Sequence, residues 1–101
     1  MLVVAGFIRI APGYRQAAVA AAKAAMEGTR RERGCISYTF SADLEDESLF
    51  YVFEEWKNQA ALDEHFQQPH MVDFQKSLAT LGVIDMQIRR YAIAQVGPLR
   101  D

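Results

Sequence analysis

The chain has little cysteine and no long apolar segment. Its one cysteine, Cys35, has no partner for an internal disulfide, which fits a reducing cytoplasm. No apolar run approaches the roughly 20 residues that a membrane-spanning helix needs. The first ten residues contain an arginine at position 9 and read as a strand rather than a signal peptide. We therefore expect a cytoplasmic protein with no membrane partner.

Neither positive nor negative charge predominates in the chain. The formal net charge is -2 over 101 residues, and the longest basic block is "RRER" at 30–33. A nucleic-acid binder needs a broader basic face to attract phosphates, so we expect no nucleic-acid partner. The 50% hydrophobic content is typical of a folded globular protein. The length predicts a single domain over 1–101, with a core at 2–96 and a short tail at 97–101.

Several signatures of catalysis are missing as well. The sequence has no glycine-rich phosphate loop, no dinucleotide fingerprint and no serine in a nucleophile elbow. The two histidines, His65 and His70, are five residues apart and lack the i, i+4 spacing of a helical zinc site. We therefore expect no metal site.

Seven segments are present whose periodicity predicts the order β-α-β-β-α-α-β. Asn58 suits a helix N-cap, Pro69 suits the first turn of the next helix, and Gly34 and Gly82 suit helix ends. This order is typical of a ferredoxin-like α+β sandwich with a four-stranded antiparallel sheet. The expected strands are 2–10, 35–42, 49–56 and 83–96, and the expected helices are 14–33, 58–68 and one from Pro69 toward Gly82.

Both faces of the expected sheet are apolar. In the strand at 49–56, Leu49, Tyr51 and Phe53 alternate with residues that are also mostly apolar. A sheet that is apolar on both faces needs a cover on both, and the chain has too few elements for a second layer. We therefore predict a homodimer in which two sheets pack face to face and form a barrel.

The helix-facing side of the sheet carries two polar candidates, Glu54 and His65. Glu54 shares the parity of Val52 and Trp56, and His65 shares an expected helix face with Leu62 and Phe66. Histidine has the ordinary pKa best suited to proton transfer near neutrality, although a hydrogen-bonded core histidine is the alternative. A buried carboxylate is costly unless it is paired, so Glu54 has a function, pairs with an arginine, or is turned to solvent by a bulge.

A small-molecule cleft is expected between the sheet and the helices, because such sites are mostly apolar with a few polar groups. The first helix presents a stripe of alanines, which either lets it lie close to the sheet or leaves room for a cavity. Helix phase and Pro69 separate the histidines, so His65 is predicted to point inward, and His70 is predicted to be structural or to lie at the pocket rim. The expected lining residues are Phe50, Val52, Trp56, Phe66, His70, Met71 and Phe74.

The stretch "ERGCISYTFSADLEDESLFYVFEEWKNQAALDEHFQQPHMVDF" at 32–74 combines these features. It resembles the antibiotic biosynthesis monooxygenase (ABM) family, whose members read roughly as a glutamate, a small loop, "GC-SY", an acidic turn, "Y-E-W", "A-L--H" and "PH". The resemblance implies a dimeric ferredoxin-like barrel with a ligand between sheet and helices. Some members oxidise quinols, anthrones or related polyphenols with dioxygen and use neither metal nor flavin.

The same resemblance implies roles for three residues. Trp56 would line the slot, His65 would assist proton removal, and Glu54 would position the histidine or a substrate hydroxyl. The implied function is that of a cofactor-free monooxygenase whose partners are a quinol-like or polyphenolic aromatic substrate and dioxygen.

Two alternatives stay open. One related branch shares the "H----PH" spacing and isomerises a phosphorylated dione, for which Arg30, Arg31 and Arg33 could contact the phosphate. The other alternative is a non-catalytic small-molecule-binding dimer. A haem-degrading branch fits less well, because it uses an asparagine on the first strand where this chain has Gly6 and Phe7.

Overall fold

Seven elements in the order β-α-β-β-α-α-β make up the computed structural model, which describes residues 1–100. One four-stranded sheet has the order β2-β3-β1-β4, and every neighbouring pair is antiparallel. The expected ferredoxin-like α+β fold is confirmed. The strands are β1 (Leu2–Ile10), β2 (Cys35–Ala42), β3 (Leu49–Trp56) and β4 (Val83–Ala92), and the helices are α1 (Arg15–Thr29), α2 (Gln59–His65) and α3 (Pro69–Leu78).

Three strands have the bounds that the sequence predicts, and the other elements are shorter than expected. Helix α1 ends at Thr29 because the chain enters a turn there, in which the Glu32 N–H donates to the Thr29 carbonyl at 2.9 Å. Strand β4 ends at Ala92 because its partner in β1, Leu2, is the first residue of that strand. The expected tail at 97–101 is described through residue 100, and Asp101 lies outside the described residues.

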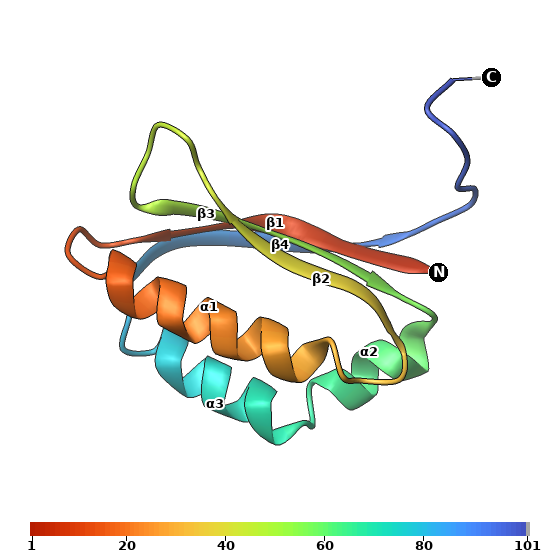
Figure 1. Ribbon diagram of the computed structural model, residues 1–101, viewed down its shortest axis with the longest axis horizontal. Coiled ribbons are helices and arrows are strands. Elements are labelled where there is room, and N and C mark those ends of the chain that lie inside the picture. The colour runs from red at the N-terminus through yellow and green to blue at the C-terminus, as the bar shows by residue number, and fades with distance from the viewer. Residues whose placement is uncertain (101) are drawn as a thin grey trace.

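The caps of the two short helices follow the sequence signals. The Asn58 side chain accepts a hydrogen bond of 2.9 Å from the Ala61 N–H, which caps α2. Pro69 stands in the first turn of α3. Gln68, between the helices, has an extended backbone, so the chain bends there. The bend gives α2 and α3 different directions (Figure 1).

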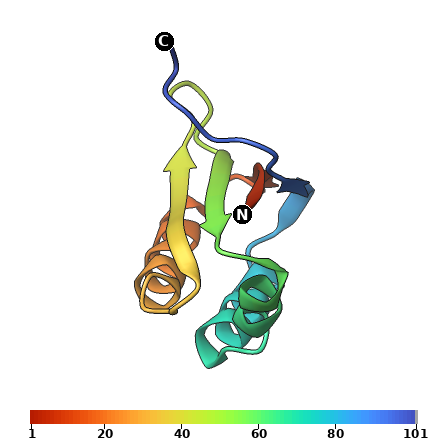
Figure 2. The same cartoon turned by 90° about the vertical axis from the view of Figure 1, so that its right-hand side faces the viewer.

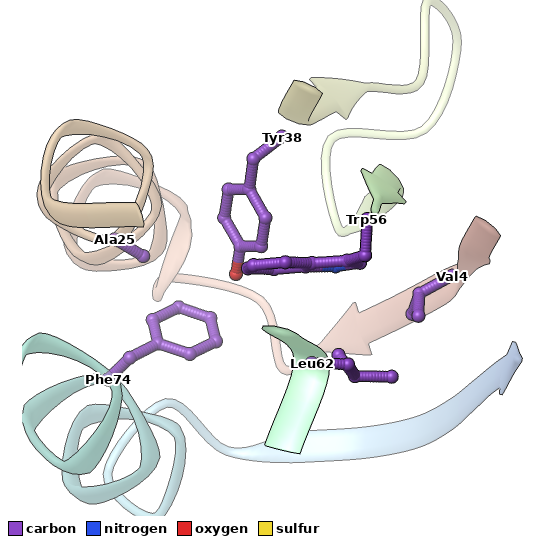
Figure 3. Close-up of a cluster of buried hydrophobic side chains, with 6 residues drawn as sticks. All are labelled: Val4, Ala25, Tyr38, Trp56, Leu62 and Phe74. Carbon is purple, nitrogen blue, oxygen red and sulfur yellow. The ribbon is translucent and has the colours of Figure 1, made fainter. Parts of the chain in front are cut away.

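All three helices cover one face of the sheet and leave the other face bare (Figures 1 and 2). The main core lies under the helices, where Tyr38 of β2 and Trp56 of β3 project from neighbouring strands toward Phe74 of α3 (Figure 3). A second buried cluster at the other end contains Ile8, Ile10, Ala18, Phe50 and Leu81. None of the helices within residues 1–100 is long and apolar enough to cross a membrane.

The bare face of the sheet is apolar, as the alternation of the strands predicts. Tyr51 and Phe53 of β3 are 41% and 47% exposed, and they lie opposite Phe7 and Ala5 of β1 in the register. Large exposed aromatic side chains on a flat sheet are typical of a surface that packs against another protein. Within residues 1–100 no element covers this face.

Candidate functional site

His65 is the last residue of α2 and is almost fully buried, with 1% of its surface exposed. Its ring lies against Trp56, at 4.6 Å between ring centroids, and against Tyr38, at 5.5 Å. Leu62, one turn earlier in α2, is also buried and anchors this face of the helix on the core. The imidazole is therefore held in one place by packing on several sides.

Glu32 is the partner of this histidine and belongs to the turn between α1 and β2. Its carboxylate Oε2 lies 2.7 Å from the Nδ1 of His65. The Glu32 carbonyl accepts a 3.1 Å hydrogen bond from the Cys35 N–H, which ties the turn to the start of β2. Glu32 is missing from the site residues predicted from the sequence, although it opens the stretch that resembles the ABM family.

His70 contacts the same carboxylate oxygen from the other side. Its Nε2 lies 2.7 Å from Glu32 Oε2, and the ring centroids of the two histidines are 6.2 Å apart. The interpretation of His65 and His70 as separated residues is therefore wrong. They belong to different helices, and the bend at Gln68 turns both rings toward one carboxylate, so spacing along a single helix does not describe them. We name Glu32, His65 and His70 the His–Glu cluster.

Two glycines let the helices approach the turn that carries Glu32. A Cβ atom on Gly28 of α1 would lie 2.5 Å from Cγ of His70, which is closer than packed carbon atoms come. A Cβ on Gly34 would lie 2.2 Å from the Cβ of Ala61 in α2. Because neither glycine has a side chain, α2 and α3 pack directly on both sides of the turn, and the histidines reach Glu32.

The buried location controls the protonation of His65. Burial lowers the pKa of His65, and the hydrogen bond and negative charge of Glu32 oppose that effect. A neutral imidazole that donates its Nδ1 proton to Glu32 keeps a basic lone pair on Nε2. That Nε2 is buried and makes no hydrogen bond with any residue from 1 to 100. The arrangement thus provides an oriented proton acceptor inside the protein.

Glu54 lies beneath the helices, as its parity in β3 predicts. Its Oε1 accepts a 2.8 Å hydrogen bond from the indole Nε1–H of Trp56. The two alternatives for Glu54, an ion pair with an arginine and a bulge that turns it to solvent, are therefore wrong. Burial raises the pKa of Glu54 to about 7, the indole hydrogen bond opposes this, and the charge of Glu32 adds to the rise. Near neutral pH this carboxyl group can therefore both hold and release a proton.

The other expected lining residues divide into three groups. Trp56, Val52, Phe50 and Phe74 are buried beneath the helices, and Met71 is half-buried against the main core. His70 lies at a rim, with 24% of its side chain exposed. Phe66 was expected on the inward face, but it is the C-cap of α2 and is half exposed.

The interior beneath the helices is nearly filled. An apolar cavity of about 20 Å³ lies between the sheet and the helices, among residues that include Phe40, Phe50 and Phe74. That volume holds about one water molecule, so an aromatic ligand needs the helices to move from the sheet. A larger surface pocket of about 370 Å³ lies beside the His–Glu cluster and includes Arg31 and Arg33 in its wall.

Cys35 is not part of this chemistry. It is half-buried at the start of β2, and burial raises the pKa of its thiol to about 11. A thiol of that pKa stays protonated at neutral pH, and the protonated form is a poor nucleophile. The proton-transfer candidates are therefore the His–Glu cluster and Glu54.

The fold and the buried histidine–carboxylate site define a class of small ferredoxin-like α+β proteins with polar groups between helices and sheet. The chain belongs to the antibiotic biosynthesis monooxygenase family, whose model matches residues 1–77. The matched residues include β1 to β3 and the whole His–Glu cluster. The resemblance seen in the sequence is thereby confirmed.

Individual relatives agree with this assignment. An uncharacterised protein of Synechocystis sp. is 38% identical over 98 residues, which cover 97% of this chain and 67% of that protein. A candidate monooxygenase of Bacillus subtilis, YcnE, is 27% identical over 74 residues, which cover 73% of this chain and 78% of YcnE. A crystal structure of a candidate antibiotic biosynthesis monooxygenase from Deinococcus radiodurans has the same fold, with a TM-score of 0.90, 24% identity and complete coverage of both chains. The chain is monooxygenase-like in kind.

Proposed function

We propose that this protein is a cofactor-free monooxygenase that oxidises a quinol-like or polyphenolic aromatic compound with dioxygen. The observation that carries the proposal is the pairing of His65 with Glu32, which leaves the buried Nε2 of His65 as an oriented base. A phenol that loses its proton becomes electron-rich enough to react with dioxygen directly. The protein then needs to supply only a base, an orientation and a dry site.

The reaction balances without an external reductant. His65 Nε2 takes the phenolic proton, and the resulting imidazolium is stabilised by the Glu32 carboxylate. The phenolate supplies electrons to dioxygen, which adds to a ring carbon that carries a hydrogen. The O–O bond then breaks as the C–H proton is lost, so one oxygen stays as a new carbonyl. The other oxygen takes that proton and the one held by His65, and leaves as water. The product is a quinone, and His65 returns its proton to the departing oxygen.

Glu54 and Trp56 complete the proposed site. The Trp56 indole ring lies against the His65 imidazole and donates to Glu54, so these three side chains form one packed group. With a pKa of about 7, Glu54 can exchange a proton with a substrate hydroxyl near neutrality. We place the aromatic ring among Trp56, Val52, Phe50, Met71 and Phe74, in a slot that opens when the helices move; of these residues, Phe50 and Phe74 also line the apolar cavity.

The test is oxygen uptake by the untagged protein with a panel of reduced quinones and polyphenols, without added metal or flavin. We expect uptake with at least one substrate, and a fall of about 100-fold or more in His65→Ala, the usual loss when a general base is removed. Full activity in His65→Ala would contradict the role of that histidine. No uptake with any substrate in the panel would contradict the proposed reaction.

Glu32 acts through His65 in this proposal, so it is a positioning residue. Glu32→Gln removes the charge that raises the pKa of His65, so we expect the acidic limb of the pH–rate profile to move to lower pH. Glu64→Gln, in the wall of the nearby pocket, is the matched control and should leave the profile in place. A lower rate with an unmoved profile would mean that Glu32 has only a structural role.

A second candidate function is the isomerisation of a small phosphorylated dione. The surface pocket of about 370 Å³ favours it, because Arg31 and Arg33 line that pocket together with Glu32 and His70. Guanidinium groups bind phosphate, and a histidine with a carboxylate can move protons between carbons. Such an isomerase works without oxygen, so anaerobic turnover of a phosphorylated dione, lost in Arg33→Ala, would favour it over the monooxygenase.

A further inference from the structure

The His–Glu cluster brings together three groups that ligate metals. Glu32 Oε2, His65 Nδ1 and His70 Nε2 all lie within 4.8 Å of one another and come from the α1–β2 turn, α2 and α3. We propose that this cluster is a binding site for a divalent first-row transition metal, with Zn²⁺ as its simplest occupant. The proposal concerns binding and does not depend on the proposed reaction.

The donor set selects the kind of metal. Two imidazole nitrogens and one carboxylate oxygen suit Zn²⁺, Co²⁺ or Fe²⁺, whereas Mg²⁺ and Ca²⁺ prefer ligand sets made only of oxygen. Three protein ligands leave a fourth position for water or another small molecule. The surface pocket beside His70 gives that position a route to solvent.

Zinc binding changes all three distances between the ligand atoms, and the two histidine nitrogens, now within 4.8 Å of each other, must also come to about 3.3 Å. Ligand atoms around a tetrahedral zinc ion are about 3.3 Å apart, since each zinc bond is about 2.0 Å long. Each histidine nitrogen now lies 2.7 Å from Glu32 Oε2, so both distances must open by about 0.6 Å. Packing holds His65 in place, while the partly exposed His70 and the carboxylate have freedom to move.

Protons are redistributed when the metal binds. Both nitrogens that contact Glu32 must give their lone pairs to the metal, so each neutral imidazole carries its proton on the other nitrogen. For His65 that other nitrogen is Nε2, the base of the proposed reaction. The metal-bound cluster and the proton-accepting cluster are therefore alternative states of the same residues.

The pocket beside the cluster is lined by two carboxylates and two guanidinium groups, so its formal charges balance. Glu32 supplies one negative charge within the cluster, and Glu64 adds a carboxylate to the wall of the pocket. Arg31 also lines this pocket, but its guanidinium is paired with Glu27 at 3.0 Å. Arg33 remains as the group that can hold an anionic fourth ligand of the metal.

The experiment is a calorimetric titration of untagged, chelator-treated protein with Zn²⁺, and a Co²⁺ titration followed by visible absorption. We expect one site per chain, with a Kd in the micromolar range or below, and intense absorption bands typical of four-coordinate Co²⁺. Removing a residue that only supports a metal ligand already costs about 10- to 100-fold in affinity, so His70→Ala should weaken Zn²⁺ binding by about 100-fold or more. Glu45→Gln, which removes an exposed carboxylate of the β2–β3 loop, should bind like the unchanged protein, and Mg²⁺ should give no saturable heat.

Fold integrity is checked for each variant by its thermal midpoint and far-ultraviolet circular dichroism. Glu32→Gln nearly preserves the shape of the side chain and is the second variant if His70→Ala does not fold. Two results would overturn the proposal. One is the absence of saturable Zn²⁺ binding, and the other is an unchanged Kd in folded His70→Ala or Glu32→Gln.

Discussion

Glu54 shows how burial changes the chemistry of a single side chain. Its neighbours in β3 on the same face, Val52 and Trp56, are buried, and one hydrogen bond from Trp56 offsets part of the lost hydration. The remaining cost appears as a pKa of about 7, well above the ordinary value of 4.5. A folded state that holds this proton more tightly than the unfolded state loses stability as the pH rises between these two values.

We therefore expect Glu54→Gln to remove that loss. The amide stays neutral and keeps an oxygen that can accept from Trp56. The difference in free energy of unfolding, variant minus unchanged protein, should increase as the pH rises from about 4.5 to 7, by on the order of 3 kcal/mol in total. The opposite contribution of His65, whose pKa is lowered, is common to both proteins. Urea denaturation at a series of pH values measures the difference, and a constant difference would contradict the raised pKa.

At the scale of elements, the site depends on how closely α1 packs on α3. His70 enters the cluster only because Gly28 leaves room for its ring beside the helix backbone. Alanine is favoured over glycine in a helix by about 1 kcal/mol, so the local preference of α1 opposes the glycine. The tight contact between helices thus takes precedence over helix propensity at this position.

Gly28→Ala should consequently destabilise the protein. The new methyl group would meet the Cβ and Cγ atoms of His70, and overpacking of this kind costs about 1–3 kcal/mol. In a His70→Ala background the ring is gone, but the Cβ of residue 70 stays 2.8 Å from the new methyl group, so the same substitution should cost less without becoming neutral. Chemical denaturation of the four proteins in this double-mutant cycle measures the coupling, and equal effects in both backgrounds would show that His70 is not the obstacle.

At the scale of the whole molecule, the bare sheet face favours the homodimer that the sequence predicts. The helices cover one face only (Figure 2). Phe53 and Tyr51 stand exposed on the other face. Two such faces packed together would remove both aromatic patches from water, at about 25 cal/mol for each Å² of apolar surface buried. Strand alternation made this prediction possible, because it assigns every second residue to the bare face.

Phe53→Lys places a charge at the centre of the proposed interface and should produce a monomer. Sedimentation at micromolar concentration should show a dimer for the unchanged protein and a folded monomer for the variant. Leu44→Lys is the matched control, because Leu44 is fully exposed in the β2–β3 loop and should not change the mass. An unchanged protein that sediments as a monomer would contradict the dimer.

The sequence by itself determined the order of the elements, most of their bounds and the two apolar faces of the sheet. These properties depend on local signals such as the alternation in β3, the Asn58 cap and the proline at the start of α3. It also identified His65 and Glu54 as buried polar residues, because parity and helix phase follow from spacing.

Only the tertiary structure decided what these residues contact. Glu32 meets His70 across 38 positions of the chain and meets His65 across 33, and the bend at Gln68 together with the close packing at Gly28 brings them together. Contacts over such separations depend on the relative placement of helices, which no local pattern of residues encodes.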